Sequence, residues 1–189
     1  MGLQLSQNPE ADALLDSEPL ALLVGMLLDQ QVPMEWAFTG PYTIAQRMGG
    51  GLDAHEIAAC DPEEFVRLCS EKPAIHRYPG SMARRVQQLC RHVADGYDGE
   101  VQAIWRDARD GRDLLRRLQA LPGYGQQKAQ IFVALLGKQL GVRPNCWREA
   151  AGSYGEEGAH RSIADVVDDA SLDRVRAYKQ EMKRARRRS

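Results

Sequence analysis

The chain has 189 residues, of which 43% are hydrophobic and 27% charged, as expected for a soluble globular protein with one domain or two closely packed lobes. No apolar run is long enough to span a membrane, and the N-terminus lacks a secretion signal, so we expect a cytoplasmic protein. The formal net charge of −1 does not by itself indicate a nucleic-acid partner.

Capping residues and helical periodicity predict an all-α chain, with no strand pair or βαβ pattern. Residues 1–16 carry scattered apolar positions and are predicted to form little regular structure, with one short turn around Ala11–Leu15. The segment Leu20–Leu28 is apolar on most faces and is predicted to be a buried helix. A polar loop, 29–33, follows it. Two short helices, 34–38 and 42–48, are then expected, separated at Gly40-Pro41.

Further helices are predicted along the rest of the chain. Asp53 and Asp61 are suited to cap two short helices, and Ser81 to cap a longer one ending near residue 95. Another helix is expected at 101–109, and Asn145 and Ser171 are suited to cap the last two. Four cysteines lack metal-type spacing, which favours buried free thiols: Cys60, Cys69, Cys90 and Cys146.

The charge is unevenly distributed along the chain. Residues 172–189 hold eight Lys/Arg against two acidic residues, a net charge of +6, so the other 171 residues carry −7. A basic end on an acidic body indicates contact with phosphates or another polyanion. The alternative interpretation is a frayed C-terminus that only aids solubility.

The stretch Leu121–Ala129 joins two predicted helices by a tight turn. Pro122 ends the first helix, while Gly123 and Gly125 are expected to adopt positive φ and to allow close approach of another surface. The second helix then begins with free N–H groups, which can bind a phosphate oxygen. The turn is therefore a candidate clamp for a nucleic-acid backbone, with an ordinary helix–helix connection as the alternative.

Three segments in order resemble the helix-hairpin-helix DNA glycosylase superfamily, which includes the endonuclease III-like base-excision repair enzymes. The first is Leu-Pro-Gly-Tyr-Gly at 121–125, with Ala129 and the apolar helix after it. The others are the buried helix and polar loop at 22–31 and the basic stretch at 77–86. The resemblance covers about residues 18–148.

The resemblance implies an all-α fold of two lobes with a DNA groove between them. We assign 18–140 to one lobe, with the helix-hairpin-helix at about 113–138, and 1–17 plus 141–189 to the other. It implies a monomer that binds damaged double-stranded DNA in the nucleoid and has no membrane partner. Relatives with an iron–sulfur cluster carry a cysteine quartet that this chain lacks. We therefore expect no cluster and no required cofactor, with a monovalent cation at the hairpin as the one implied ligand.

Both charged catalytic positions of the family correspond to amides in this chain. A gapless count places the family's aspartate at Asn145 and the lysine of its strand-cleaving members at Gln127. Lys128 is adjacent to Gln127 but points about 100° away on a helix. The missing amine argues against lyase activity, because a Schiff base needs one. Asn145 can orient a water without supplying charge, or can simply cap a helix.

Several explanations for the missing aspartate remain open. A carboxylate from elsewhere can take its role, with candidates Glu149, Asp165, Asp168 and Glu35. Asn145 can also suffice for a labile substrate, because a cationic alkylated base leaves the sugar with less catalytic help. The protein can also bind damaged DNA without cutting it.

The resemblance also implies a set of DNA contacts. Gln31 occupies the position of a residue that wedges into the gap left by a flipped base, with a loop amide that bonds the local backbone as the alternative. Trp36, Tyr42 and Trp147 are candidates to stack on that base, with packing in the core as the alternative. The predicted backbone contacts come from the hairpin and the basic stretch: Gly123, Tyr124, Gly125, Gln126, Lys128, His76, Arg77, Arg84 and Arg85.

These features predict a monofunctional DNA N-glycosylase that removes a damaged base, for example an alkylated one. The alternative function is a catalytically silent module of the same fold that recognises DNA damage or DNA structure. A third, weaker alternative is an all-α scaffold that has lost DNA binding.

Overall fold

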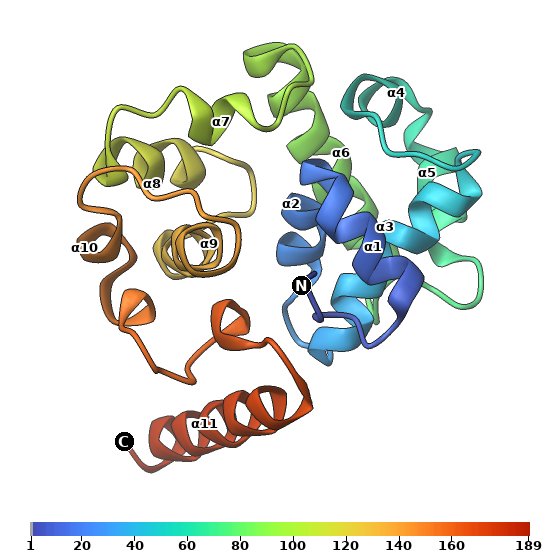
Figure 1. Cartoon of the computed structure of the whole chain (residues 1–189). Coiled ribbons are helices and arrows are strands. Elements are labelled where there is room, and N and C mark those ends of the chain that lie inside the picture. Colours follow the sequence, from blue (N-terminus) through green and yellow to red (C-terminus); the bar gives the residue numbers. More distant parts are fainter. Residues whose placement is uncertain (1) are drawn as a thin grey trace. The chain divides into compact units, whose positions relative to one another are not determined.

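The computed structural model describes residues 2–189, and within that range it contains eleven α-helices, two 3₁₀-helices and no strand (Figure 1). The all-α prediction is confirmed. The chain divides into two compact units. Unit 1 holds the described residues up to Asp107 together with Ala120–Tyr124, and unit 2 holds Ala108–Gln119 and Gly125–Ser189. None of the helices in the described part is both long and apolar enough to cross a membrane.

Unit 1 is built around α2, which is buried at every position from Leu20 to Leu28. This helix has no polar residue, so it has no face to present to water. α1, α3 and α6 all pack against it. The helices of unit 1 are α1 (Pro9–Ser17), α2 (Pro19–Leu28), α3 (Met34–Arg47), α4 (Ala54–Ala59), α5 (Pro62–Ser70), α6 (Pro79–Tyr97) and α7 (Ala103–Arg106).

Two predictions in this region were wrong. Residues 9–17 form α1, because the Asn8 side chain accepts hydrogen bonds from the N–H groups of Glu10 and Ala11 and proline occupies the first helical position. The predicted break at Gly40-Pro41 is absent, and α3 is continuous. An interior proline costs about 3 kcal/mol, but Phe38 and Ile44 are completely buried on this helix, and each contributes about 1.5–3 kcal/mol.

Unit 2 is built around α9, against which α8, α10, η1 and η2 pack. The division of the chain into these two units differs from the predicted lobes. The second helix of the hairpin, α9, belongs with the C-terminal elements, and α1 belongs with α2 and α3. The elements of unit 2 are α8 (Gly111–Gln119), α9 (Gln126–Gln139), α10 (Trp147–Ala151), η1 (Gly152–Gly155), η2 (Ile163–Asp165) and α11 (Asp169–Arg188).

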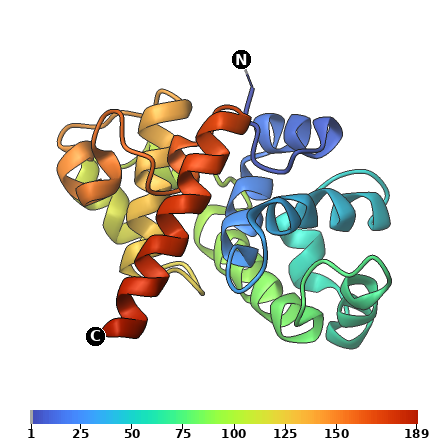
Figure 2. The ribbon, with the colours of Figure 1, turned by 90° about the horizontal axis from the view of Figure 1, so that it is seen from below.

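α11 begins beside the C-terminal end of α9. Lys138 Nζ lies 2.6 Å from Asp165 Oδ1 in η2, and the Gln139 amide donates to three carbonyls of residues 163–166. α11 starts four residues after Asp165, and Asp168 is its N-cap. The predicted cap, Ser171, is instead the partner of Asp168 in a capping box. Figure 2 shows α11 running in the opposite direction to α9, so that the C-terminus lies at the end of unit 2 where α9 begins.

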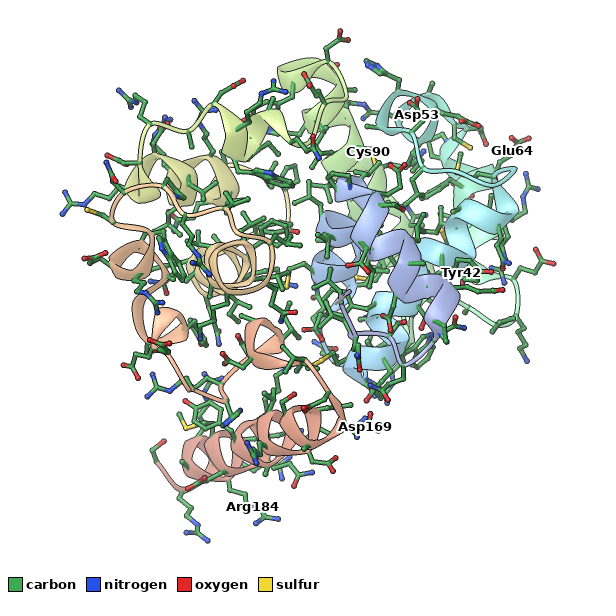
Figure 3. All side chains as sticks on the ribbon, viewed as in Figure 1. Tyr42, Asp53, Glu64, Cys90, Asp169 and Arg184 are labelled. Atoms are coloured by element: carbon green, nitrogen blue, oxygen red, sulfur yellow. The ribbon has the colours of Figure 1, made fainter. Side chains whose placement is uncertain are left out.

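The cysteines are only partly buried, in contrast to the prediction. Cys69 and Cys90 lie in the core of unit 1, where burial raises the pKa of each thiol to about 12 (Cys90 is labelled in Figure 3). These two are inert packing residues. Cys60 is half-buried and Cys146 is exposed. In the described part of the chain, no group of three His, Cys, Asp or Glu side chains is placed to hold a metal ion.

Candidate nucleic-acid interface and catalytic site

The first half of the hairpin turn is fixed by packing within unit 1. Gly123 has φ +84°, and an added Cβ would collide with Leu27 Cδ1. Tyr124 is buried, and its hydroxyl donates a 2.7 Å hydrogen bond to the carbonyl of Leu23. Burial raises the pKa of this phenol well above its ordinary value. The Tyr124 side chain therefore supports the core, a different role from the predicted DNA contact.

The second half of the turn is bare. Gly125 has φ −81°, so the expected positive φ occurs only at Gly123. It is the N-cap of α9, no side chain caps the helix, and an added Cβ would meet no atom within 4 Å. Neither backbone conformation nor packing in the protein explains a glycine here. An uncovered helix N-terminus suits the close approach of a phosphate oxygen, with Gln126 and Gln127 exposed beside it.

Gln127, at the family's lysine position, forms a hydrogen bond with a tyrosine that was not among the residues predicted from the sequence. Its Nε2 donates a 2.9 Å hydrogen bond to the hydroxyl of Tyr154 in η1. The loop that carries Tyr154 is itself fixed, because Arg148 donates to the carbonyl of Gly155 at 2.6 Å and Arg161 to that of Ser153 at 2.9 Å. No motif marks Tyr154 in the sequence, where it lies in a glycine-rich stretch.

The contacts of α9 show that Asn145 does not lie beside Gln127. α10 and η1 return along α9 in antiparallel order: the Trp147 ring packs against Gly137, and Gln130 Nε2 donates to the carbonyl of Ala150. Gly137 is ten residues from Gln127, hence about 15 Å along the helix axis. Asn145 precedes Trp147 and lies at that far end. Asn145 stays at the C-terminal end of α9 because the chain returns along this helix only after it, in α10 and η1.

Asn145 is exposed, and its carbonyl accepts a 2.7 Å hydrogen bond from the N–H of Gly111. The prediction that Asn145 caps α10 was wrong. The N-cap of this helix is Cys146, at φ +62°, and no side chain makes a capping hydrogen bond there. Glu149 is exposed on α10. It lines an open surface depression with Arg148, Gly152, Gly155, Glu156 and Glu157.

The other candidate carboxylates hold structural positions. Asp165 forms the ion pair with Lys138 and accepts from the N–H of Arg161 at 2.9 Å. Asp168 caps α11, and the N–H and hydroxyl of Ser171 lower the pKa of its carboxyl group. Glu35 is half-buried in the first turn of α3 in unit 1.

The predicted wedge, Gln31, is exposed in a left-handed conformation at φ +61°. A buried histidine fixes its loop, since His76 Nε2 lies 2.8 Å from the Gln30 carbonyl and Nδ1 accepts from the N–H of Tyr78. The Gln30 side chain accepts from Arg85 at 3.2 Å. His76 is thus a support for the loop rather than a phosphate contact. Three of the predicted phosphate ligands are exposed: Arg77, Arg84 and Arg85.

The three predicted stacking residues all have other partners. Trp147 is buried with its ring against Gly137, and the Arg148 guanidinium lies 4.6 Å from the centroid of the Trp147 ring. Trp36 donates to the carbonyl of Ala74 at 2.8 Å. Tyr42, labelled in Figure 3, donates to Glu10 at 2.5 Å, and this bond raises the pKa of its phenol.

The helical fold and the turn at the start of α9 define a helix-hairpin-helix protein. Residues 24–189 match the family described as HhH-GPD superfamily base excision DNA repair protein. The match covers most of the chain, which therefore belongs to this superfamily and confirms the resemblance. No curated protein and no solved structure matches the chain.

Proposed function

We propose that this base-excision repair protein is a monofunctional DNA N-glycosylase that acts on a damaged, alkylated base in duplex DNA. It acts as a monomer and needs no cofactor. The bare N-terminus of α9 at Gly125 would hold a backbone phosphate, and Gln31 would enter the gap left by the flipped base.

The observation that carries the proposal is the hydrogen bond between Gln127 and Tyr154. The position that holds a lysine nucleophile in strand-cleaving relatives is an amide engaged with a phenol. Without an amine no Schiff base with the sugar can form, so only hydrolysis of the base–sugar bond remains.

An alkylated base follows from the neutral character of this site. Breaking the bond develops positive charge on the sugar, which a carboxylate ordinarily stabilises. The group beside Gln127 is the Tyr154 hydroxyl, and Asn145 is at the other end of α9. A cationic alkylated base is already a good leaving group and needs less of that stabilisation. Of the predicted carboxylates on unit 2, Asp165 pairs with Lys138 and Asp168 caps α11, whereas Glu149 is exposed on α10.

The second candidate function is a DNA-damage binding module without catalysis. The same neutral site favours it, because amides stand at both charged catalytic positions of the family.

Incubation with duplexes that each carry one modified base, followed by alkali, tests the proposal, because alkali cuts wherever a base has been released. We expect cleavage only after alkali and no borohydride-trapped adduct. Tyr154→Phe should slow base release about tenfold, the value of one neutral hydrogen bond, while Asn145→Asp leaves it unchanged. Binding to a modified duplex without release of any base would favour the silent module. An adduct trapped by borohydride would exclude the monofunctional assignment.

The hairpin contact has its own test in Gly125→Val. An added side chain would stand in the open space where the phosphate approaches. We expect affinity to fall equally for all duplex sequences, because phosphate contacts carry no sequence information. An unchanged affinity would show that the hairpin is only a connector.

A further inference from the structure

The distal segment of α11, residues 179–188, is a charged surface that the proposed site does not include. It holds six Lys/Arg against Glu181, a net charge of +5 in a chain whose total is −1. All ten residues are exposed, whereas Leu172 and Val175 in the first half of α11 are buried. Figure 3 labels Arg184, whose side chain stands on the outer side of this helix.

The charges of the distal segment repel one another in the free protein. Lys183 and Arg187 lie at one-turn spacing, as do Arg184 and Arg188, and like charges at this spacing destabilise a helix. No apolar side chain of the segment is buried to offset this repulsion. A polyanion would remove it and stabilise the helix at the same time.

The packing of unit 2 determines where these charges lie. The Lys138–Asp165 pair and the Gln139 amide hold the start of α11 at the C-terminal end of α9, and α11 then runs back toward the start of α9 (Figure 2). α9 has 14 residues and is therefore about 21 Å long. The same length of α11 ends near Lys183, so the most basic turns lie level with Gly125. η2 contacts both α9 and the start of α11, so at that end the two helix axes lie roughly two packing distances, about 16–20 Å, apart.

We infer that the distal segment is a second phosphate-binding surface, held at the end of unit 2 where α9 begins, for the backbone of the same duplex DNA. The inference rests on the proposed DNA partner. Each strand of a duplex rises 3.4 Å per phosphate along the duplex axis, so a separation of this size spans about five or six phosphates along that axis. The antiparallel run of α11 thus gives the protein two contacts with the DNA backbone instead of one.

Neutralising the charges is the first test. For an undamaged duplex, the slope of log affinity against log salt should fall in the double variant Arg184→Gln/Arg187→Gln by up to about 1.8, or about 0.9 per contact. The matched control is Arg174→Gln/Arg176→Gln, which removes the same charge from the same helix at its other end. Its slope should stay that of the wild type. Equal slopes in all three proteins would overturn the inference.

A variant that keeps every charge tests the placement itself. Gln180→Pro interrupts the exposed part of α11 between Tyr178 and Lys183, whereas Gln180→Ala preserves it. We expect the slope of log affinity against log salt to fall as far in the proline variant as in the neutralised variant. In the alanine variant the slope should stay that of the wild type. If the proline variant kept the wild-type slope, the segment would be a loose polycation and the inference would be wrong.

These measurements do not depend on base release, so the two proposals can fail separately. A protein that releases no base but loses slope as described supports the second phosphate surface and not the glycosylase. A protein that releases a base but keeps its slope in every variant supports the glycosylase and overturns the second surface.

Discussion

The two ends of unit 2 differ in almost every physical respect. At the start of α9, Gly125 is bare and Gln127 is exposed, and the basic turns of α11 lie level with them. At the other end, Gly137 lies under the Trp147 ring and Lys138 forms an ion pair in which the side chains are 14% and 5% exposed. Stability and ligand contact are therefore separated along one helix. Substitutions at the packed end should unfold the protein, and substitutions at the bare end should change only what it binds.

Lys138→Met should show the largest effect. It leaves Asp165 buried without its counter-charge, and breaking a buried pair in this way costs about 3–5 kcal/mol. The free energy of unfolding in urea measures the loss. Lys183→Met, the same change on the exposed distal segment, should stay within about 0.5 kcal/mol of the wild type. Comparable losses in the two variants would contradict the separation.

Gly137→Ala should have the next largest effect. The added methyl group would collide with the Trp147 ring, and overpacking of this kind costs about 1–3 kcal/mol. The matched change Gly125→Ala adds the same group where φ is −81° and no atom lies within 4 Å. Because alanine adopts this conformation without strain, the free energy of unfolding of this variant should rise by about 0.4–1 kcal/mol. The comparison would be broken if Gly125→Ala were the more destabilising of the two.

Cys146→Gly should have the smallest effect, and it should be stabilising. Cys146 has φ +62°, a conformation that costs a residue with a Cβ about 1–2 kcal/mol, and the greater freedom of unfolded glycine offsets about 0.5–1 kcal/mol of that gain. Thermal unfolding should therefore show a gain of about 0.5 kcal/mol. Cys60→Gly, at φ −62°, relieves no strain and should destabilise. A loss of stability in Cys146→Gly would mean that the turn before α10 tolerates the cysteine without strain.

The sequence was sufficient to predict the fold in the segments where one physical signal dominates. The unbroken apolar run of α2 and the Pro-Gly-x-Gly turn before α9 each allow one structure, and both were predicted correctly. Local signals were misleading where tertiary packing decides. Gly40-Pro41 reads as a helix break, but a Cβ at Gly40 would lie 2.5 Å from Leu28 Cδ1, so close packing requires a glycine within a continuous helix.

The candidate site was less predictable because it depends on where the chain reverses. Counting from the hairpin assumes a fixed path, and nothing in the sequence shows that α10 and η1 return along α9 in antiparallel order. That geometry brings Tyr154 to Gln127 and leaves Asn145 at the other end. Gly125 was identified for the wrong physical reason, since its φ is ordinary and its importance lies in the space around it.

The burial of α2 also affects how the unfolded chain behaves. In the native protein its leucines, valine and methionine are covered on all sides, so every one of them becomes exposed when unit 1 opens. A ten-residue segment without a charge or an internal proline is a strong site for self-association. Heating should therefore end in aggregation rather than in a reversible transition, and the lifetime of the folded protein would be set by its rate of unfolding. The same helix that organises unit 1 makes each unfolding event costly to reverse.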